Sequence, residues 1–253
     1  MKANSNNWIT TLNPRPEARC RLYCLPHAGG GAALFRTWPE GLPADVEVCP
    51  IQLPGREMRF TEPRFTSITR LVQTLAPLIL PHLQKPFAVF GYSMGALIGF
   101  ELIRELRRLH APAPRRLLIA ARQAPQLVAT HPPLHKLPDT DFFEALHRRY
   151  GGIPAAALNN QEIRNIYIPL LKADVEMIET YRYHPEPPLA CPISVFGGRS
   201  DSIAEADLRA WQQQSSRSVY VQIMEGSHFF MHTAQADLLA VISRQLSADL
   251  ARP

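Results

Sequence analysis

The sequence predicts a mostly parallel, doubly wound α/β sheet with an inserted helical lid. Three observations lead to this fold class. Short apolar strands alternate with helical segments, one interval between strands is too long for a single crossover, and 253 residues that are 46% hydrophobic can bury one sizeable core. We therefore interpret residues 1–253 as one domain, in which residues 1–18 are flexible and about 132–190 form the lid.

Six short runs of apolar or β-branched residues, bounded by proline and glycine, are typical of strands. They cover residues 19–25, 46–53, 87–91, 116–121, 193–197 and 218–224. Helical periodicity lies between them, at residues 67–84, 95–109, 204–213 and 234–248. Strand and helix thus alternate along the chain, as they do in a parallel sheet.

The alternation stops between residues 122 and 190. This interval carries two helical patterns, DTDFFEALHRRY and NQEIRNIYIPLLKADVEMIETYRY. Long insertions at the carboxyl edge of such sheets are where substrate lids lie, so we expect a helical cap over the site. Each apolar position in it, taken singly, is equally compatible with ordinary core packing.

The charge balance is basic, with a formal net charge of +5 and a pI near 9.2. The arginines are scattered in short clusters and lack the interleaved aromatic residues of nucleic-acid binding, so we expect no nucleic-acid partner. We interpret them as a solvated surface, with a landing site for an acidic protein as the alternative. The clusters are Arg104, Arg107 and Arg108; Arg115 and Arg116; and Arg148 and Arg149.

The four cysteines are Cys20, Cys24, Cys49 and Cys191, and none has metal-ligand spacing to a neighbouring histidine. Cys20 and Cys24 on one strand would lie roughly 13 Å apart, too far for a disulfide. We expect buried free thiols, no metal and no cofactor. Residues 1–18 lack a signal-peptide apolar run, and no stretch is long enough to span a membrane, which favours a cytoplasmic protein without a membrane partner.

The segment FAVFGYSMGALIGFELIREL places Gly91-Tyr92-Ser93-Met94-Gly95 between a strand and a helix. In this context G-x-S-x-G is the nucleophile elbow of an α/β-hydrolase, where small residues let the backbones approach and the serine is held in a strained turn. The helix that follows directs its N-terminus at the developing negative charge. The pattern predicts Ser93 as the nucleophile.

A serine hydroxyl needs a base, and the chain has nine histidines. His228 follows a strand and a glycine in EGSHFF, at the place that the Ser, acid, His chain order assigns to the base. Asp201, just after a strand in ISVFGGRSDSIA, is the candidate acid that orients the imidazole. Asp174 in the lid is the reserve candidate, and a mere helix N-cap is the alternative role for Asp201.

An oxyanion hole needs two backbone N–H groups. One is expected from Met94, directly after the nucleophile. The second is expected from Ala28 or a neighbour, in the loop LPHAGGGA at residues 25–32, whose glycines permit a tight turn after a strand. A flexible linker is the alternative for this loop. A phosphate-binding loop is disfavoured, because no Lys-Ser/Thr follows the glycines.

With these residues identified, the sequence resembles the type II thioesterases of nonribosomal peptide and polyketide synthesis, from about residue 20 to 248. The resemblance rests on LPHAGGGAALFRTWPEGLP, QLPGRE, FGYSMGA, LKADVEMIETYRY, FGGRSD and GSHFFM. It implies Ser93, Asp201 and His228 as a triad, with the Met94 and Ala28 amides as the oxyanion hole. Where the family often has histidine this chain has Tyr92, which we expect to alter the wall beside the nucleophile.

The resemblance also implies the substrate: acyl or aminoacyl thioesters on the phosphopantetheine arm of a carrier protein, hydrolysed to clear misprimed or stalled modules. Carrier proteins are generally acidic, which suits the basic charge balance. We expect a monomer. A general carboxylesterase or lipase and an acyltransferase are the alternatives, whereas the intact set of Ser93, Asp201 and His228 argues against a non-catalytic binding module.

Overall fold

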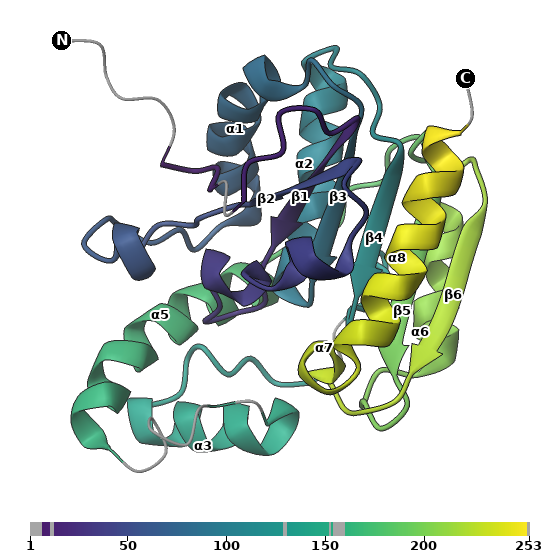
Figure 1. Ribbon diagram of the computed structural model, residues 1–253. Helices are drawn as coiled ribbons and strands as arrows, with labels where there is room; N and C mark the ends of the chain where they lie inside the picture. Colours follow the sequence, from purple (N-terminus) through teal and green to yellow (C-terminus); the bar gives the residue numbers. More distant parts are fainter. Residues whose placement is uncertain (1–6, 11–12, 129–130, 152, 154–159, 252–253) are drawn as a thin grey trace, which may run out of the picture.

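Six parallel strands form the central sheet of the protein. The structure, a computed structural model, describes residues 7–10, 13–128, 131–151, 153 and 160–251. Within them the strand order is β2-β1-β3-β4-β5-β6 and every neighbouring pair is parallel (Figure 1). The strands are β1 (Cys20–Leu25), β2 (Val46–Pro50), β3 (Phe87–Tyr92), β4 (Arg116–Ala120), β5 (Ile193–Gly198) and β6 (Val219–Met224).

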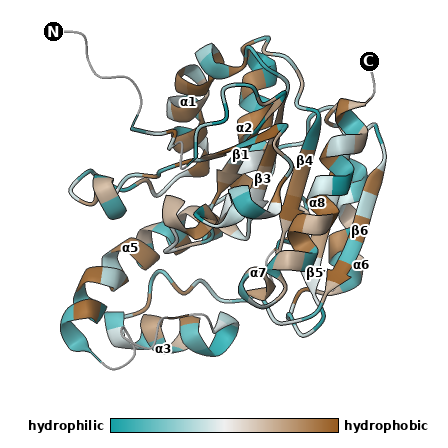
Figure 2. Ribbon diagram, viewed as in Figure 1, coloured by the Kyte–Doolittle hydropathy of each residue, from teal (hydrophilic) through white to brown (hydrophobic). Residues whose placement is uncertain are grey.

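Helices cover both faces of the sheet (Figure 1). Helices α1 (Ile68–Ile79), α2 (Met94–Arg108) and α6 (Glu205–Arg209) pack on one face. Helices α7 (Phe230–Thr233) and α8 (Gln235–Leu250) pack on the other. Because both faces are covered, strands β3 and β4 are buried along their whole length and almost entirely hydrophobic (Figure 2).

The predicted fold class is confirmed, and each predicted strand and helix has a counterpart within a few residues. One helical pattern extends further than the helix it produces. The second lid pattern runs to residue 183, but helix α5 (Gln161–Glu179) ends before it. The following segment is rich in proline and is tied to α2 by Arg104 and Arg107, which donate to the carbonyls of His184 and Pro187.

In the described part of the inserted segment, helices α3 (Asp139–Tyr150) and α5 lie below the sheet in Figure 1. Their facing side chains form a hydrophobic cluster separate from the two clusters beside the sheet. Its buried members are Leu134, Phe142, Phe143, Leu146, Ile168, Leu171 and Val175. The expected lid boundaries include residues 152 and 154–159, and the expected flexible segment includes 1–6 and 11–12, all of which lie outside the described residues.

The interpretation of the arginine clusters as solvated surface is wrong for Arg104 and Arg116, which are 2% and 8% exposed. Arg116 on β4 makes a bidentate pair with Asp249 of α8, at 2.7 and 2.8 Å. Arg104 pairs with Glu101 and Glu186. Although burial raises the pKa of Glu186, hydrogen bonds from the arginines of α2 outweigh it and lower this pKa to about 2.

The four cysteines are buried and free of disulfides, as predicted. Burial raises the pKa of Cys20, Cys49 and Cys191 to about 12, so these thiols stay protonated and unreactive near neutral pH. Among the described residues, no helix is apolar over enough of its length to cross a membrane, and no cluster of His, Cys, Asp or Glu is arranged as a metal site.

Replacing Asp249 with asparagine should lower the free energy of unfolding by about 3 kcal/mol, because Arg116 is then buried without its counter-charge. Urea unfolding measures the loss. Asp237→Asn, at an exposed position of the same helix, is the control and should change the free energy of unfolding by less than about 1 kcal/mol. Equal losses of unfolding free energy in the two variants would show that the Arg116–Asp249 pair does not stabilise the fold.

Candidate active site

The site lies where the strand order reverses. The chain runs from β1 outward to β2 and then returns to β3 on the other side of β1. Loops that leave the carboxyl ends of β1 and β3 therefore diverge and leave a crevice between them, which is the usual ligand site of an open parallel sheet. The glycine loop follows β1 and the turn at Ser93 follows β3.

Ser93 occupies a strained backbone conformation, with φ 52° and ψ −106°, between β3 and α2. Its N–H donates to the carbonyl of Ala120 at 2.8 Å. Glycines on both sides make this turn possible. A Cβ on Gly91 would lie 2.2 Å from the carbonyl oxygen of Gly95, and a Cβ on Gly95 would lie 2.2 Å from that of Leu25. The turn is thus pressed against the end of β1.

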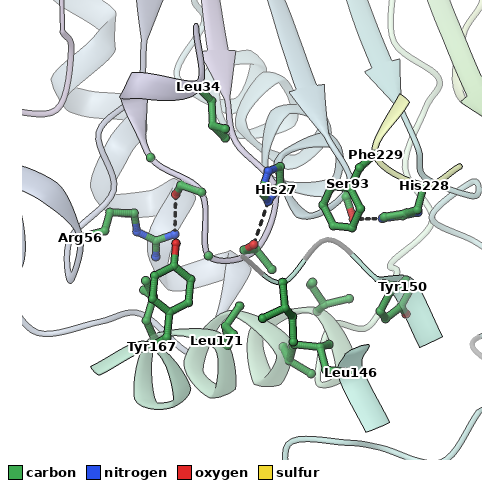
Figure 3. Close-up of a pocket in the computed structure, with 18 of the residues that line it drawn as sticks. His27, Leu34, Arg56, Ser93, Leu146, Tyr150, Tyr167, Leu171, His228 and Phe229 are labelled. Atoms are coloured by element: carbon green, nitrogen blue, oxygen red, sulfur yellow. Dashed lines mark hydrogen bonds between the residues drawn. The ribbon is translucent and has the colours of Figure 1, made fainter. Parts of the chain in front are cut away.

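Ser93, His228 and Asp201 form a continuous hydrogen-bonded chain. Ser93 Oγ lies 3.0 Å from His228 Nε2, and His228 Nδ1 lies 2.9 Å from Asp201 Oδ2 (Figure 3 shows the first contact). Because a carboxylate only accepts, Nδ1 carries the imidazole proton and Nε2 is free to accept the serine proton. The Asp201 side chain is 1% exposed. The structure therefore brings the three residues singled out in the sequence into one site.

Asp201 is not a helix N-cap. Helix α6 begins four residues later at Glu205, with Ala204 at the cap position and no side-chain cap. The loop that carries Asp201 is instead held by Ser200 N–H, which donates to the carbonyl of Gly226 at 2.9 Å, just ahead of His228. The loops after β5 and β6 are thus tied together, and the tie aligns the carboxylate with the imidazole.

Asp174, the reserve acid candidate, does not contact His228. Both of its oxygens are engaged by Arg56, with Nη1–Oδ2 at 2.9 Å and Nη2–Oδ1 at 2.8 Å. Oδ2 also accepts from the N–H of Gly29 at 2.8 Å. This buried ion pair beside the glycine loop was missed in the sequence, since residues 118 apart carry no visible sign of pairing. The QLPGRE and LKADVE motifs contain its two halves.

Two backbone N–H groups on the turns around Ser93, those of Ala28 and Met94, take part in no hydrogen bond among the described residues. Their neighbours in the glycine loop are engaged, Gly29 by a carboxylate at 2.8 Å and Gly30 by a carbonyl at 3.0 Å. Both donors named from the sequence are thus available.

We expected Tyr92 to alter the wall beside the nucleophile, but Tyr92 does not line the cavity. Because side chains alternate along a strand, its fully buried ring lies in the cluster on the α8 face of the sheet. Its hydroxyl donates to the carbonyl of His228 at 2.6 Å and accepts from Met231 N–H at 3.3 Å. Burial raises the pKa of Tyr92 well above its usual value. Tyr92 therefore anchors the loop of the base from behind.

A cavity of about 620 Å³ lies between the turns of Ser93 and His228 and the lid helices α3 and α5 (Figure 3). Apolar lid side chains dominate its wall, and the Tyr150 ring packs on the imidazole at 5.1 Å. His27 and Arg122 add polar groups. Burial lowers the pKa of His27 to about 4, so this imidazole is neutral near pH 7. Sequence reasoning identified the lid but not Tyr150 or Arg122, because no motif marks them.

This sheet and the hydrogen-bonded Ser93 identify the protein as an α/β-hydrolase of the serine class. The thioesterase domain family model matches residues 20–246. The gramicidin S biosynthesis protein GrsT of Aneurinibacillus migulanus is 38% identical over 247 residues, 97% of this chain and 96% of the relative. The chain belongs to the thioesterase family, in its type II branch.

Solved structures agree with that assignment. The type II thioesterase BorB from the borrelidin biosynthetic cluster is 31% identical, with a TM-score of 0.86 over 97% of this chain and 100% of that one. The RedJ thioesterase from the prodiginine pathway of Streptomyces coelicolor is 34% identical, with a TM-score of 0.85 over 92% of this chain and 87% of that one. The fold and the family therefore agree along nearly the whole chain.

Tyr92→Phe should lower the free energy of unfolding by about 1–3 kcal/mol, because the His228 carbonyl and the Met231 N–H lose a buried partner. It should also lower kcat several-fold, since the loop of His228 loses an anchor. Thermal unfolding and steady-state kinetics measure the two effects. Tyr220→Phe, whose hydroxyl is exposed, is the control. Equal changes in the free energy of unfolding and in kcat for both variants would show that the Tyr92 hydroxyl does not support the base.

Proposed function

We propose that this type II thioesterase hydrolyses acyl and aminoacyl thioesters on the phosphopantetheine arms of carrier proteins and so clears misprimed or stalled nonribosomal peptide and polyketide synthesis modules. The observation that carries the proposal is the Ser93–His228–Asp201 hydrogen-bonded chain at the floor of an apolar cavity of about 620 Å³. The type II relatives support the choice of substrate.

Ser93 is the proposed nucleophile and His228 the general base. As Oγ attacks the thioester carbonyl, its proton passes to Nε2 across the present 3.0 Å contact. Asp201, 2.9 Å from Nδ1, keeps the imidazole in the required tautomer and stabilises the imidazolium. The N–H groups of Met94 and Ala28 stabilise the oxyanion of the tetrahedral intermediate.

Collapse of this intermediate breaks the C–S bond, and the pantetheine sulfur leaves with the proton held by His228. The acyl group remains as an ester on Ser93. A water molecule then gives a proton to His228 and attacks the ester through a second oxyanion intermediate, and the serine leaves as the proton returns to it. Because a thiolate is a good leaving group, the first half of the cycle depends less on leaving-group protonation than amide hydrolysis does.

The partner follows from the reaction. A phosphopantetheine arm must deliver its thioester to a serine inside the cavity, so the carrier protein has to dock outside while the arm enters. The formal charge of +5 favours an acidic carrier. We place the reaction in the cytoplasm, in keeping with the four free, buried thiols, and expect a monomer to carry it out.

Ser93→Ala should lower the rate of acyl release from a phosphopantetheinylated carrier by about 10⁴-fold or more, since the nucleophile is lost. Release is followed by mass spectrometry of the carrier. Circular dichroism and the unfolding midpoint establish that the variant is folded. Ser243→Ala, on the α8 face of the sheet, should retain the wild-type rate. Substantial release by folded Ser93→Ala would rule out this mechanism.

The carrier should itself contribute to recognition. For a given acyl group, kcat/KM on the acyl-carrier should exceed that on the matching N-acetylcysteamine thioester or p-nitrophenyl ester by at least about tenfold, equivalent to about 1.4 kcal/mol. A panel of acyl chains, with unacylated carrier as competitor, measures the difference. Equal or reversed values would favour a general esterase over the proposed function.

A further inference from the structure

The peptide group between Ala28 and Gly29 is held at both ends. Its carbonyl oxygen accepts from Nδ1 of His27 at 2.8 Å, and its N–H donates to Asp174 Oδ2 at 2.8 Å. Figure 3 shows the His27 contact, on the same side of the cavity as Ser93. A peptide group fixed at its oxygen and at its nitrogen cannot rotate. The preceding peptide group, which carries the Ala28 N–H, is held at its own oxygen, because the His27 carbonyl accepts from the Gly30 N–H at 3.0 Å. Since a peptide group is planar, this contact constrains the direction of the Ala28 N–H.

Asp174 can hold Gly29 because Arg56 holds Asp174. The two side chains are 0% and 5% exposed and meet in a bidentate pair. Arg56 Nη1 also donates to the carbonyl of Gly30 at 3.0 Å, drawn as a dashed line in Figure 3. The ion pair thus holds successive residues of the glycine loop, one through the carboxylate and one through the guanidinium. Bidentate geometry of this kind fixes position as well as charge.

The same carboxylate belongs to lid helix α5. One turn before Asp174, Leu171 packs on the glycine loop so closely that a Cβ on Gly29, where φ is +76°, would lie 2.7 Å from Leu171 Cδ2. Leu171 is also a member of the hydrophobic cluster that α5 shares with α3. The conformation of the glycine loop is therefore tied to the seating of the lid.

We propose that the Arg56–Asp174 ion pair is a positioning device that aims the Ala28 N–H at the reacting carbonyl and does so only while α5 is seated on the glycine loop. Lid seating and oxyanion stabilisation are then coupled through one buried carboxylate. The proposal rests on the proposed function in one respect, that the Ala28 N–H is an oxyanion donor. Arg56 and Asp174 are positioning residues in this account and do not touch the reacting atoms.

The expected loss of kcat can be estimated from the effect of removing an oxyanion donor. Complete removal of one oxyanion donor lowers kcat by about 10²–10³-fold. Asp174→Asn keeps the shape of the side chain but removes its charge, which weakens its contacts with Arg56 and the Gly29 N–H. Arg56→Lys keeps the positive charge but loses the bidentate geometry. Each variant should lower kcat by about ten- to a hundredfold, with KM changed much less, because the defect appears only in the transition state.

The experiment compares two inhibitors in the full-length enzyme. A trifluoromethyl ketone analogue of acyl-pantetheine forms an oxyanion adduct with the serine, whereas the corresponding amide binds as the ground state. In Asp174→Asn and Arg56→Lys the inhibition constant of the ketone should rise by about the factor by which kcat/KM falls. That of the amide should change less than about twofold. A merely structural role would weaken both inhibitors equally.

The chain offers a matched control in Arg116–Asp249, a second buried bidentate pair whose residues do not line the cavity. Asp249→Asn should destabilise the fold and yet leave kcat per folded molecule unchanged. Hydrogen exchange gives a second readout, because peptides covering residues 27–33 and 161–179 should exchange faster together in Asp174→Asn. The Arg56→Lys variant keeps the test valid if Asp174→Asn does not fold.

Rates are measured on p-nitrophenyl acetate as well as on an acyl-carrier, which separates the two proposals. Hydrolysis of the ester without hydrolysis of the carrier thioester would remove the proposed function and leave the positioning test intact. Wild-type kcat in folded Asp174→Asn and Arg56→Lys, or equal weakening of ketone and amide, would overturn the positioning role whatever the substrate.

Discussion

The close contact between the turn at Ser93 and the end of β1 is the constraint on which the site depends. Gly95 lies against the carbonyl of Leu25 with no room for a Cβ. This contact holds the serine in its strained conformation and brings the start of α2 next to the glycine loop after β1. The turns that carry the N–H groups of Ala28 and Met94 are adjacent because β1 pairs with β3 up to Leu25 and Gly91 and the two backbones touch just beyond that pair.

Buried polar side chains also position the loops of the site. Tyr92 holds the loop of His228 from behind the sheet, and Asp174 reaches up from the lid to the glycine loop. Each of these side chains engages at least one backbone group, so burial orders the loops and does not leave polar atoms without partners. Side chains that do not take part in the reaction thereby position the loops that do. Arg56 is one example, because it donates to the carbonyl of Gly30 in the glycine loop.

Local patterns were enough to predict the sheet, the lid helices and the residues Ser93, His228 and Asp201, because hydrophobic period and the glycine-serine turn are written in contiguous residues. What escaped prediction depends on contacts between distant residues. The burial of Arg116 follows from a partner 133 positions away. The orientation of Tyr92 depends on which sheet face its side chain occupies, and its position next to Ser93 in the chain had led us to expect it beside the nucleophile.

In the proposed mechanism, thioester cleavage passes through an acyl group on Ser93. Mixing the enzyme with an acyl-carrier, stopping the reaction in acid within milliseconds to seconds and mapping the protein by mass spectrometry tests it directly. We expect the peptide that contains Ser93 to gain the mass of the acyl group before the free acid accumulates. Release of the acid at full rate with no acylated enzyme, or acylation of a different residue, would contradict it.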